Sequence, residues 1–216
     1  MSLREMLKNG ALELGVDLSN KAITDLLAYK DFMLEYNEKV NLTAITDEHD
    51  FIAKHLLDCL TLVSHLPQGS RVIDIGTGAG LPGMVLKIAR PDLYITLLDA
   101  RAKKLKFLDE AIERLALTDI CTIHARAEDL QKEKGYAKGF DFAVSRAVAA
   151  MDKLCGWCLP FVKQGGAFIA MKGPNYADEL ATAKPIIKKL GAVVDKITEL
   201  TLPNEEITRN IIFIQK

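Results

Sequence analysis

The stretch RVIDIGTGAGLPG, residues 71–83, combines a glycine-rich turn with a carboxylate. Gly76, Gly78 and Gly80 alternate in the turn, and Asp74 stands two residues before the first of them. Glycine permits positive φ and lets a ligand approach the backbone closely, so turns of this kind often cradle nucleotide phosphates. A carboxylate would repel a phosphate, whereas it would attract a cation by a few kcal/mol at an effective dielectric of ~20. We therefore expect Asp74 to face a cationic ligand group.

A second carboxylate, Asp99, ends the next predicted strand, about 20 residues after Gly78, where acidic side chains commonly accept a hydrogen bond from a ribose hydroxyl. Both features suit a dinucleotide as well as S-adenosylmethionine. S-adenosylmethionine carries an ammonium and a sulfonium and no phosphate, so Asp74 favours it. The alternative is that Asp74 caps the loop and that the glycines form a purely structural turn.

Length and composition bound the remaining possibilities. The 216 residues are 49% hydrophobic and 26% charged with a net charge of −1, which suits one sizeable domain with at most a small appendage. No apolar run approaches the ~18 residues of a membrane span, and MSLREMLKNG lacks a signal-peptide core. The four cysteines form no spaced disulfide framework. We expect a monomeric cytoplasmic protein with no membrane partner.

The pattern of apolar residues changes along the chain. Residues 1–66 show helical periodicity only, with Ser19 placed to cap one helix and residues 50–66 forming another that ends before Pro67. From residue 71, short β-branched runs alternate with helices. The predicted strands are 71–75, 93–98, 120–124, 141–145 and 167–171, and the predicted helices are 82–90, 101–117, 150–159 and 177–190. Such alternation predicts right-handed crossovers and a parallel sheet.

The last two predicted strands, 192–202 and 209–216, have no helix between them. They should form a hairpin, so one final strand runs antiparallel to the rest, as is typical of methyltransferases rather than dehydrogenases. The sequence predicts an α/β fold: a class I methyltransferase-like, doubly wound, mostly parallel seven-stranded sheet with one antiparallel C-terminal strand. This Rossmann-like domain spans residues 67–216, and residues 1–66 form a helical N-terminal cap.

Further motifs resemble one family. LLDARAKKLKFL, HARAED, SRAVA, MKG and RNIIFIQK, with NEKVNLTAIT and HLLDCL nearer the N-terminus, are similar to the 16S ribosomal RNA guanine-N7 methyltransferases, also called ribosomal small-subunit methyltransferase G or glucose-inhibited division protein B. The similarity covers most of the chain from about residue 30. The glycine motif alone indicates only the class I superfamily, whereas the GLPG extension, SRA and the Asn-Leu-Thr turn are specific. Ala79 stands where many members carry proline.

The resemblance implies methyl transfer from S-adenosylmethionine to N7 of one guanosine of 16S rRNA, nucleotide 527 in the usual rRNA numbering. The partner would be 16S rRNA, free, in the 30S subunit or in an assembly intermediate. The guanine N7 lone pair is available at neutral pH, so in-line attack needs orientation and no proton removal. No catalytic base is therefore assigned.

Carried over residue by residue, the resemblance places Gly76, Leu81, the pair Ala127-Glu128 and Arg146 at cofactor-contacting positions. Ala127 and Glu128 follow the third predicted strand, at the carboxyl edge where ligands of open α/β sheets bind, and suit a contact with adenine. Arg146 ends the fourth strand on that edge, and its plain alternative is a surface arginine. The predicted cofactor site comprises Asp74, Gly76, Gly78, Gly80, Leu81, Asp99, Ala127, Glu128 and Arg146.

Basic residues predict an RNA-binding rim. RAKKLK, residues 101–106, places four cations at the start of a helix, where each is unfavourable by ~0.3–1 kcal/mol when exposed. Their presence there suggests phosphates nearby, although a solvated helix face explains them equally well. Other cations lie near predicted strand or loop ends. The predicted RNA-binding residues are Arg101, Lys103, Lys104, Arg126, Lys172 and Arg209.

Two further clusters have simpler explanations. Cys155 and Cys158 form a C-x-x-C inside a predicted helix with no second pair, so we expect buried, idle thiols. His55 and Asp58 share one helix face and would supply only half a metal site, so we expect hydrogen-bonded packing and no metal. Two other functions stay open: a Rossmann-type NAD-dependent oxidoreductase, opposed by Asp74 and the final hairpin, and a cofactor-binding rRNA assembly factor without catalysis.

Overall fold

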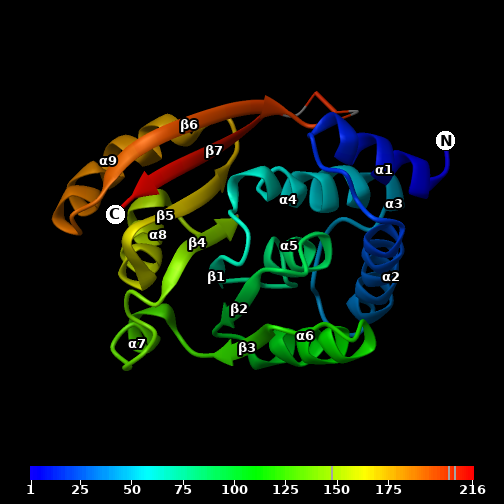
Figure 1. The fold of residues 1–216 in the computed structure, drawn as a ribbon, viewed down its shortest axis with the longest axis horizontal. Coiled ribbons are helices and arrows are strands. Elements are labelled where there is room, and N and C mark those ends of the chain that lie inside the picture. The colour runs from blue at the N-terminus through cyan, green and yellow to red at the C-terminus, as the bar shows by residue number, and fades with distance from the viewer. Residues whose placement is uncertain (147, 204, 207) are drawn as a thin grey trace.

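In the computed structural model, which describes residues 1–146, 148–203, 205–206 and 208–216, the strands form one seven-stranded sheet. Their order is β3-β2-β1-β4-β5-β7-β6 (Figure 1). The strands are β1 (Arg71–Ile75), β2 (Tyr94–Asp99), β3 (Ile120–His124), β4 (Phe140–Arg146), β5 (Val162–Lys172), β6 (Val193–Thr201) and β7 (Thr208–Gln215). β1 to β5 pair in parallel, and β7 is antiparallel to both β5 and β6. The predicted sheet and its antiparallel end are confirmed.

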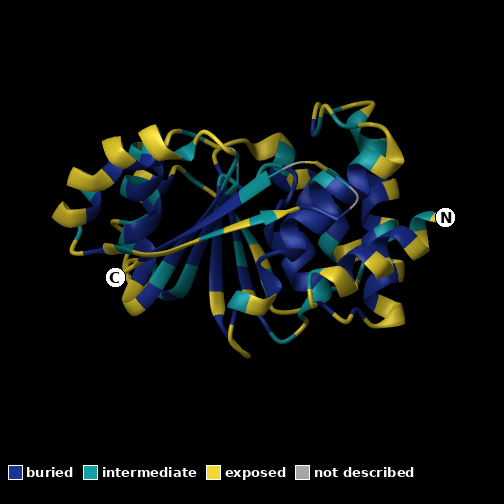
Figure 2. Ribbon diagram, turned by 90° about the horizontal axis from the view of Figure 1, so that it is seen from above, coloured by how far each residue is buried: buried dark blue, intermediate teal, exposed yellow. Residues whose placement is uncertain are grey.

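Helices cover both faces of the sheet. After β1 the helices are α5 (Gly83–Ala89), α6 (Ala102–Arg114), α7 (Ala127–Leu130), α8 (Met151–Cys158) and α9 (Tyr176–Lys189). Before β1 lie α1 (Leu3–Glu13), α2 (Asn20–Asn37), α3 (Glu48–Phe51), a π-helical turn (Ile52–Leu57) and α4 (Asp58–Leu60). Figure 2 shows the central strands and the inner helix faces buried, with exposed residues on the outer helix faces and along the edge strand β6. None of the described helices is long and apolar enough to cross a bilayer.

Local signals explain where the N-terminal helices begin. Ser19 accepts a hydrogen bond from the Ala22 N–H (3.1 Å) at the start of α2, as its sequence position predicts. The helix predicted over residues 50–66 is interrupted, because a π-helical turn follows α3 and separates it from α4. Such a turn adds one residue per turn relative to an α-helix, which an apolar pattern does not reveal.

The N-terminal helices share one core with the sheet domain. Phe107 of α6 packs against three aromatic rings of α2, those of Tyr29, Phe32 and Tyr36, with ring centroids 5.1–6.2 Å apart. The Tyr29 hydroxyl also donates to the Ala79 carbonyl in the glycine loop. The division into residues 1–66 and 67–216 stays a prediction, and the buried contacts continue across it.

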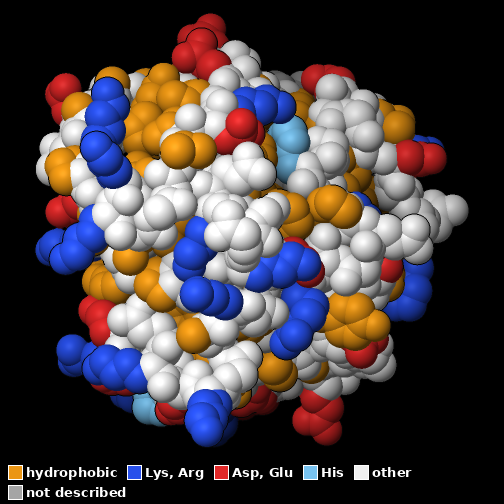
Figure 3. Space-filling model, turned by 60° about the vertical axis from the view of Figure 1, so that its left-hand side comes forward, with side chains coloured by type: hydrophobic (Ala, Val, Ile, Leu, Met, Phe, Trp, Pro, Cys, Tyr) orange, Lys and Arg blue, Asp and Glu red, His pale blue; other side chains and the backbone are white. Residues whose placement is uncertain are grey.

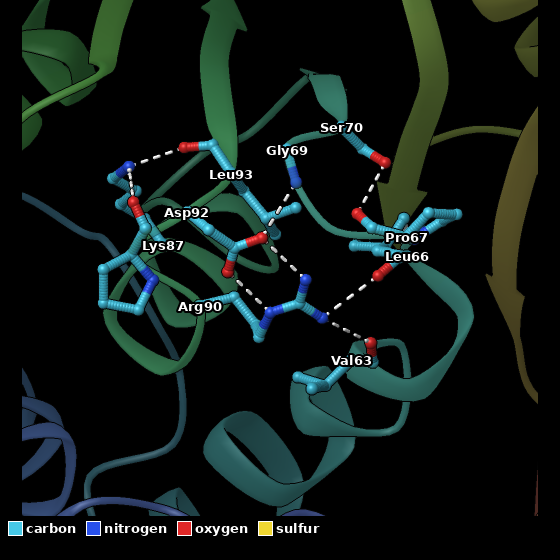
Figure 4. Close-up of polar contacts among 10 residues, drawn as sticks. Val63, Leu66, Pro67, Gly69, Ser70, Lys87, Arg90, Asp92 and Leu93 are labelled. Atoms are coloured by element: carbon cyan, nitrogen blue, oxygen red, sulfur yellow. Dashed lines mark hydrogen bonds and ion pairs between the residues drawn. The ribbon is translucent and has the colours of Figure 1, made fainter.

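An ion-pair cluster fastens the linker before β1 to the turn after α5 (Figure 4). Arg90 donates to both carboxylate oxygens of Asp92 (2.7 Å each) and to the carbonyls of Leu66 (3.0 Å) and Val63 (3.4 Å). Asp92 also accepts from the Gly69 N–H (3.0 Å). The hydrogen bonds from Arg90 lower the pKa of Asp92 to about 2. The cluster therefore stays charged and holds the end of the helical segment against the first strand.

Three residues in predicted features lie outside the described residues. Ala147 belongs to the SRA motif, and Asn204 and Ile207 belong to the turn predicted between the last two strands.

Candidate cofactor and acceptor site

A cavity of about 420 Å³ lies at the carboxyl edge of the sheet, where small-molecule sites of open α/β folds occur. Its walls come from the segments that follow β1, β2, β3 and β4, and from the turn after α2. The strand order reverses at β1, whose neighbours are β2 and β4. In Figure 3, Lys and Arg side chains gather near the middle of one face of the molecule, while Asp and Glu lie mostly toward its margin.

The glycine loop adopts the conformation that its sequence predicts. Gly76, Gly78 and Gly80 have φ values of 68°, 59° and 87°. Gly76 and Gly78 line the cavity, and Leu81 lines it next to the loop. Gly80 does not: a Cβ there would lie 2.4 Å from Met84 Cγ. The structure therefore corrects the predicted cofactor contact of Gly80 to a packing requirement beneath the loop.

Five of the N–H groups of this loop are already hydrogen bonded within the protein. Those of Gly76 and Thr77 donate to the Leu98 carbonyl (2.8 and 3.0 Å), and that of Gly78 donates to Asp99 Oδ2 (2.9 Å). The Gly80 and Leu81 N–H groups donate to the Thr77 carbonyl. A phosphate cradle needs N–H groups that point at the ligand. This loop therefore suits a cofactor without phosphates.

Asp74 lies behind the loop and not in the cavity wall. It is fully buried, and its Oδ2 accepts from Thr77 Oγ1 (2.7 Å) and from the Gly83 N–H (2.9 Å). Oδ1 is also buried and has no hydrogen-bond partner among the described residues. Burial raises the pKa of Asp74 to about 6. The predicted contact with a cationic ligand group is corrected: Asp74 ties the loop to the start of α5.

Asp99 and Glu128 also line the cavity. Asp99 Oδ1 accepts from the Arg101 N–H (2.8 Å), so each oxygen holds one backbone hydrogen bond and keeps a lone pair for a ligand hydroxyl. Glu128 follows Ala127 at the start of α7, and its Oε1 accepts from Trp157 Nε1 (2.7 Å). Ala127, Glu128 and Trp157 all line the cavity. Trp157, the one tryptophan of the sequence, was not predicted there.

The C-x-x-C around Trp157 plays no visible part in the cavity. Cys155 and Cys158 are buried, free thiols in α8. Burial raises the pKa of Cys155 to about 12, so its reactive thiolate form is disfavoured. The expectation of buried thiols is confirmed.

Arg146 connects the cavity to the N-terminal helices. Its Nη1 donates to the Lys54 carbonyl (2.9 Å) and to Asp58 Oδ2 (3.0 Å), and its Nη2 lies 3.1 Å from His55 Nδ1. The other Asp58 oxygen accepts from Arg209 Nε (3.0 Å). His55 and Asp58 thus serve hydrogen-bonded packing, as expected. Across the described residues, no group of three or more His, Cys, Asp or Glu side chains could hold a metal ion.

The predicted basic rim is only partly assembled at the cavity. Arg101, Lys104 and Arg126 line it, and Lys103 is exposed on the same helix as Lys104. Burial, followed by the charge of Arg101, lowers the pKa of Lys104.

The other two predicted RNA-binding cations are engaged elsewhere. Lys172 Nζ binds Glu179 (2.7 Å) and the Ala149 carbonyl (2.8 Å), and Arg209 binds Asp58. Neither Lys172 nor Arg209 lines the cavity. The structure therefore gives both cations intramolecular partners in place of an open position at the rim.

The chain matches a family model described as rRNA small subunit methyltransferase G over residues 22–209. It belongs to that family. It is 44% identical to "Ribosomal RNA small subunit methyltransferase G" of Alkaliphilus oremlandii, across all of this chain and 91% of the relative. The identity to the protein of the same name from Acetivibrio thermocellus is 45%, across all of this chain and 89% of the relative.

Solved structures show the same fold. A SAM dependent methyltransferase from Aquifex aeolicus has a TM-score of 0.57 at 15% identity, covering 77% of this chain and 93% of that one. M. jannaschii TYW2 in complex with AdoMet has a TM-score of 0.56 at 14% identity, covering 69% and 70%. The predicted class I methyltransferase fold is confirmed.

As a member of the rRNA small subunit methyltransferase G family, the protein is a methyltransferase that uses S-adenosylmethionine. The predicted cofactor is confirmed, and the NAD-dependent oxidoreductase alternative is excluded. Most N–H groups of the glycine loop are bonded within the protein, which disfavours a phosphate-bearing cofactor on physical grounds that are independent of the family.

Three residues that the sequence motifs did not predict there also line the cavity: Leu42, Thr43 and His55. The available signals were the Asn-Leu-Thr turn for Leu42 and Thr43 and the HLLDCL motif for His55, which carried the family resemblance but indicated nothing about their positions in space.

The buried Asp74 predicts a pH-dependent contribution to stability. Its pKa is raised from 3.8 to about 6, so the folded protein holds this proton more tightly than the unfolded chain. The stabilisation is complete below pH ~4 and is lost as the pH rises through ~6, a change of about 3 kcal/mol. Asp74→Asn removes this titration. The free energy of unfolding of both proteins is measured with urea from about pH 4 to 8. As the pH rises, the wild type should lose stability relative to Asp74→Asn, and the difference between the two should level off above pH ~7. A difference that is constant with pH would contradict this assignment.

Proposed function

We propose that this protein methylates N7 of guanosine 527 of 16S rRNA and that it acts in the cytoplasm as a monomer. Family membership supports the rRNA substrate. The observation that carries the choice of N7 is the side of the cavity next to β4, where Leu42, Thr43, His55, Arg146 and Val148 form the wall. None of these side chains is a carboxylate.

His55 does not supply a base either. Burial, with the nearby charge of Arg146, lowers the pKa of His55 to about 4, so the ring is neutral. Both ring nitrogens are within hydrogen-bonding distance of protein partners: Nε2 of Thr43 Oγ1 (2.7 Å) and Nδ1 of Arg146. An exocyclic amine or a ribose hydroxyl would need proton removal. Guanine N7 needs none, and this wall suits such an acceptor.

The residues around the remainder of the cavity suit S-adenosylmethionine. Glu128 and Ala127 would hold the adenine, and Asp99 would accept from the ribose hydroxyls. Gly76 and Gly78 leave room for close approach to the backbone, with Leu81 beside them. The bound cofactor supplies the electrophilic methyl group. Arg146 positions the wall of the site and removes no proton, because a guanidinium has only donors.

For the RNA, we propose that Arg101, Lys104 and Arg126 bind phosphates at the cavity mouth, with Lys103 beside them on α6. Cations at the start of a helix are unfavourable alone, and a phosphate offsets that cost. Lys172 and Arg209 would act indirectly, through the ion pairs that hold β5 and β7.

The test of the function is quenched-flow transfer of a labelled methyl group from S-adenosylmethionine. Substrates are bare 16S rRNA, 30S subunits and an assembly intermediate, and the modified base is identified by mass spectrometry. At saturating RNA and cofactor, the single-turnover rate should vary little from about pH 6 to 9, because no base titrates. An ascending limb near neutrality that one carboxylate or histidine substitution abolishes would identify a different acceptor atom. Cofactor binding without transfer would identify an assembly factor.

Salt dependence tests the RNA contacts. Lys103→Ala combined with Lys104→Ala should weaken RNA binding and leave the affinity for S-adenosylhomocysteine unchanged. Each lost phosphate contact should reduce the slope of log affinity against log salt by ~0.7–0.9. Lys184→Ala is the matched control, because Lys184 is exposed on α9 and does not line the cavity. Equal slopes for all three proteins would place α6 off the path of the RNA.

A further inference from the structure

The turn after α2 holds Thr43 by its backbone. Asn37 Oδ1 accepts from the N–H groups of Leu42 (2.7 Å) and Thr43 (3.0 Å), and Asn37 Nδ2 donates to the Thr43 carbonyl (3.0 Å). One side chain therefore satisfies three backbone groups of the turn. Since both the N–H and the carbonyl of Thr43 are fixed, the position of its side chain at the cavity wall is fixed too.

The Thr43 hydroxyl oxygen has two further partners. The Ile45 N–H donates to it (3.0 Å), and His55 Nε2 lies 2.7 Å away. A hydroxyl has one proton and two lone pairs. If His55 donates as well, both lone pairs are occupied and the hydroxyl can act only as a donor to a third group.

Arg146 decides the direction of the hydrogen bond from His55. His55 Nδ1 lies 3.1 Å from both Arg146 Nη2 and the Lys54 carbonyl. The guanidinium has only donors and is always charged, so Nδ1 accepts from it, and the Lys54 carbonyl accepts from Arg146 Nη1 instead. The proton of the neutral ring is then on Nε2, which donates to Thr43.

This chain of hydrogen bonds leaves the Thr43 O–H with one role. The chain runs from Arg146 through His55 to Thr43. The His55 ring and the Ile45 N–H occupy the two lone pairs of the Thr43 hydroxyl. No acceptor for the Thr43 proton is found among the described residues, and Thr43 lines the cavity. The structure thus presents a fixed hydrogen-bond donor in the cavity wall, linked to Arg146 through His55.

We infer that the Thr43 hydroxyl is a specificity-determining group that donates a hydrogen bond to O6 of the acceptor guanine. This inference rests on the proposed function. Guanine presents N7 and O6 side by side, and both are acceptors, whereas adenine presents an N6 amine next to its N7. A group that can only donate, placed beside the position of N7, accepts guanine and leaves an adenine amine facing a donor.

The test compares two changes at the same hydrogen bond. Thr43→Val removes the hydroxyl at similar volume, and Thr43→Ser keeps it. The RNA carries either guanosine or 2-aminopurine riboside, which keeps N7 and lacks O6, at the target nucleotide. Single-turnover methyl transfer is measured at saturating RNA and S-adenosylmethionine. Because the intrinsic reactivity of N7 differs between the two bases, the informative quantity is the guanine-to-2-aminopurine rate ratio of each protein.

We expect Thr43→Val to slow transfer to guanine by about tenfold and to lower the rate ratio by the same factor, with Thr43→Ser close to wild type. The ratio should not change between about pH 6 and 9, because His55 stays neutral. An unchanged ratio in Thr43→Val would overturn the inference. So would a loss of S-adenosylhomocysteine affinity with the ratio intact, because the hydroxyl would then serve the cofactor. Absence of guanine-N7 transfer by the wild type would instead refute the proposed function.

Discussion

The structure depends on one buried charge cluster, in which Asp58 lies between the guanidinium groups of Arg146 and Arg209. The Asp58 side chain is only 2% exposed, so water cannot take the place of Arg146 and Arg209 in compensating its charge. Removing one partner of a buried ion pair typically costs about 3–5 kcal/mol, because the remaining charge is uncompensated. The cluster joins the N-terminal helices to β4 and β7 at the edge of the cavity.

This constraint explains why the N-terminal helices belong to the site. Arg146 is supplied by the sheet, but its hydrogen-bond acceptors come from the segment around the π-helical turn. That segment also supplies His55, and His55 together with Asn37 fixes Thr43. The part of the cavity proposed to hold the cofactor is built by the segments that follow β1 to β3, and the part proposed to hold the acceptor is built jointly by β4 and the N-terminal helices. π-helical turns are frequent at functional sites, and here the turn carries the carbonyl and the imidazole that Arg146 binds.

The sequence predicted the sheet well because its signals are local. β-branched runs, their spacing and the missing helix before the last strand were enough for the strand set and the antiparallel end. The π-helical turn was missed because an apolar pattern does not distinguish it from an α-helix. β5 is also longer than predicted: it begins at Val162, where the prediction began at residue 167, since Gly165 and Gly166 weaken a strand signal.

The site was harder to predict because side-chain direction and partners are non-local. The charge of Asp74 could be read from the sequence, but its direction into the core could not. The cofactor prediction was correct, and the structure adds a reason that the sequence did not show, namely that most of the loop N–H groups are already hydrogen bonded within the protein. The partner of Lys172 lies seven residues away and that of Arg209 lies 151 residues away, so only the fold shows that both cations are paired.

The chemistry that the proposed function implies is catalysis by placement. A neutral nucleophile such as guanine N7 gains from orientation within reach of the methyl group, and no protein group needs to change its protonation state. The cavity wall next to β4, which we propose faces the acceptor, meets this requirement because Arg146, His55 and Thr43 hold one another in place.

The most direct measurement of the central claim is the ¹⁵N chemical shift of the His55 ring nitrogens. Selective labelling leaves four histidines to assign, and His55→Gln identifies the relevant pair. With Arg146 donating to Nδ1 and the ring pKa near 4, Nε2 should carry the proton and Nδ1 should be unprotonated, unchanged from about pH 6 to 9. A protonated Nδ1, or a titration near the ordinary histidine pKa, would contradict the claim that Arg146 organises the acceptor end of the site.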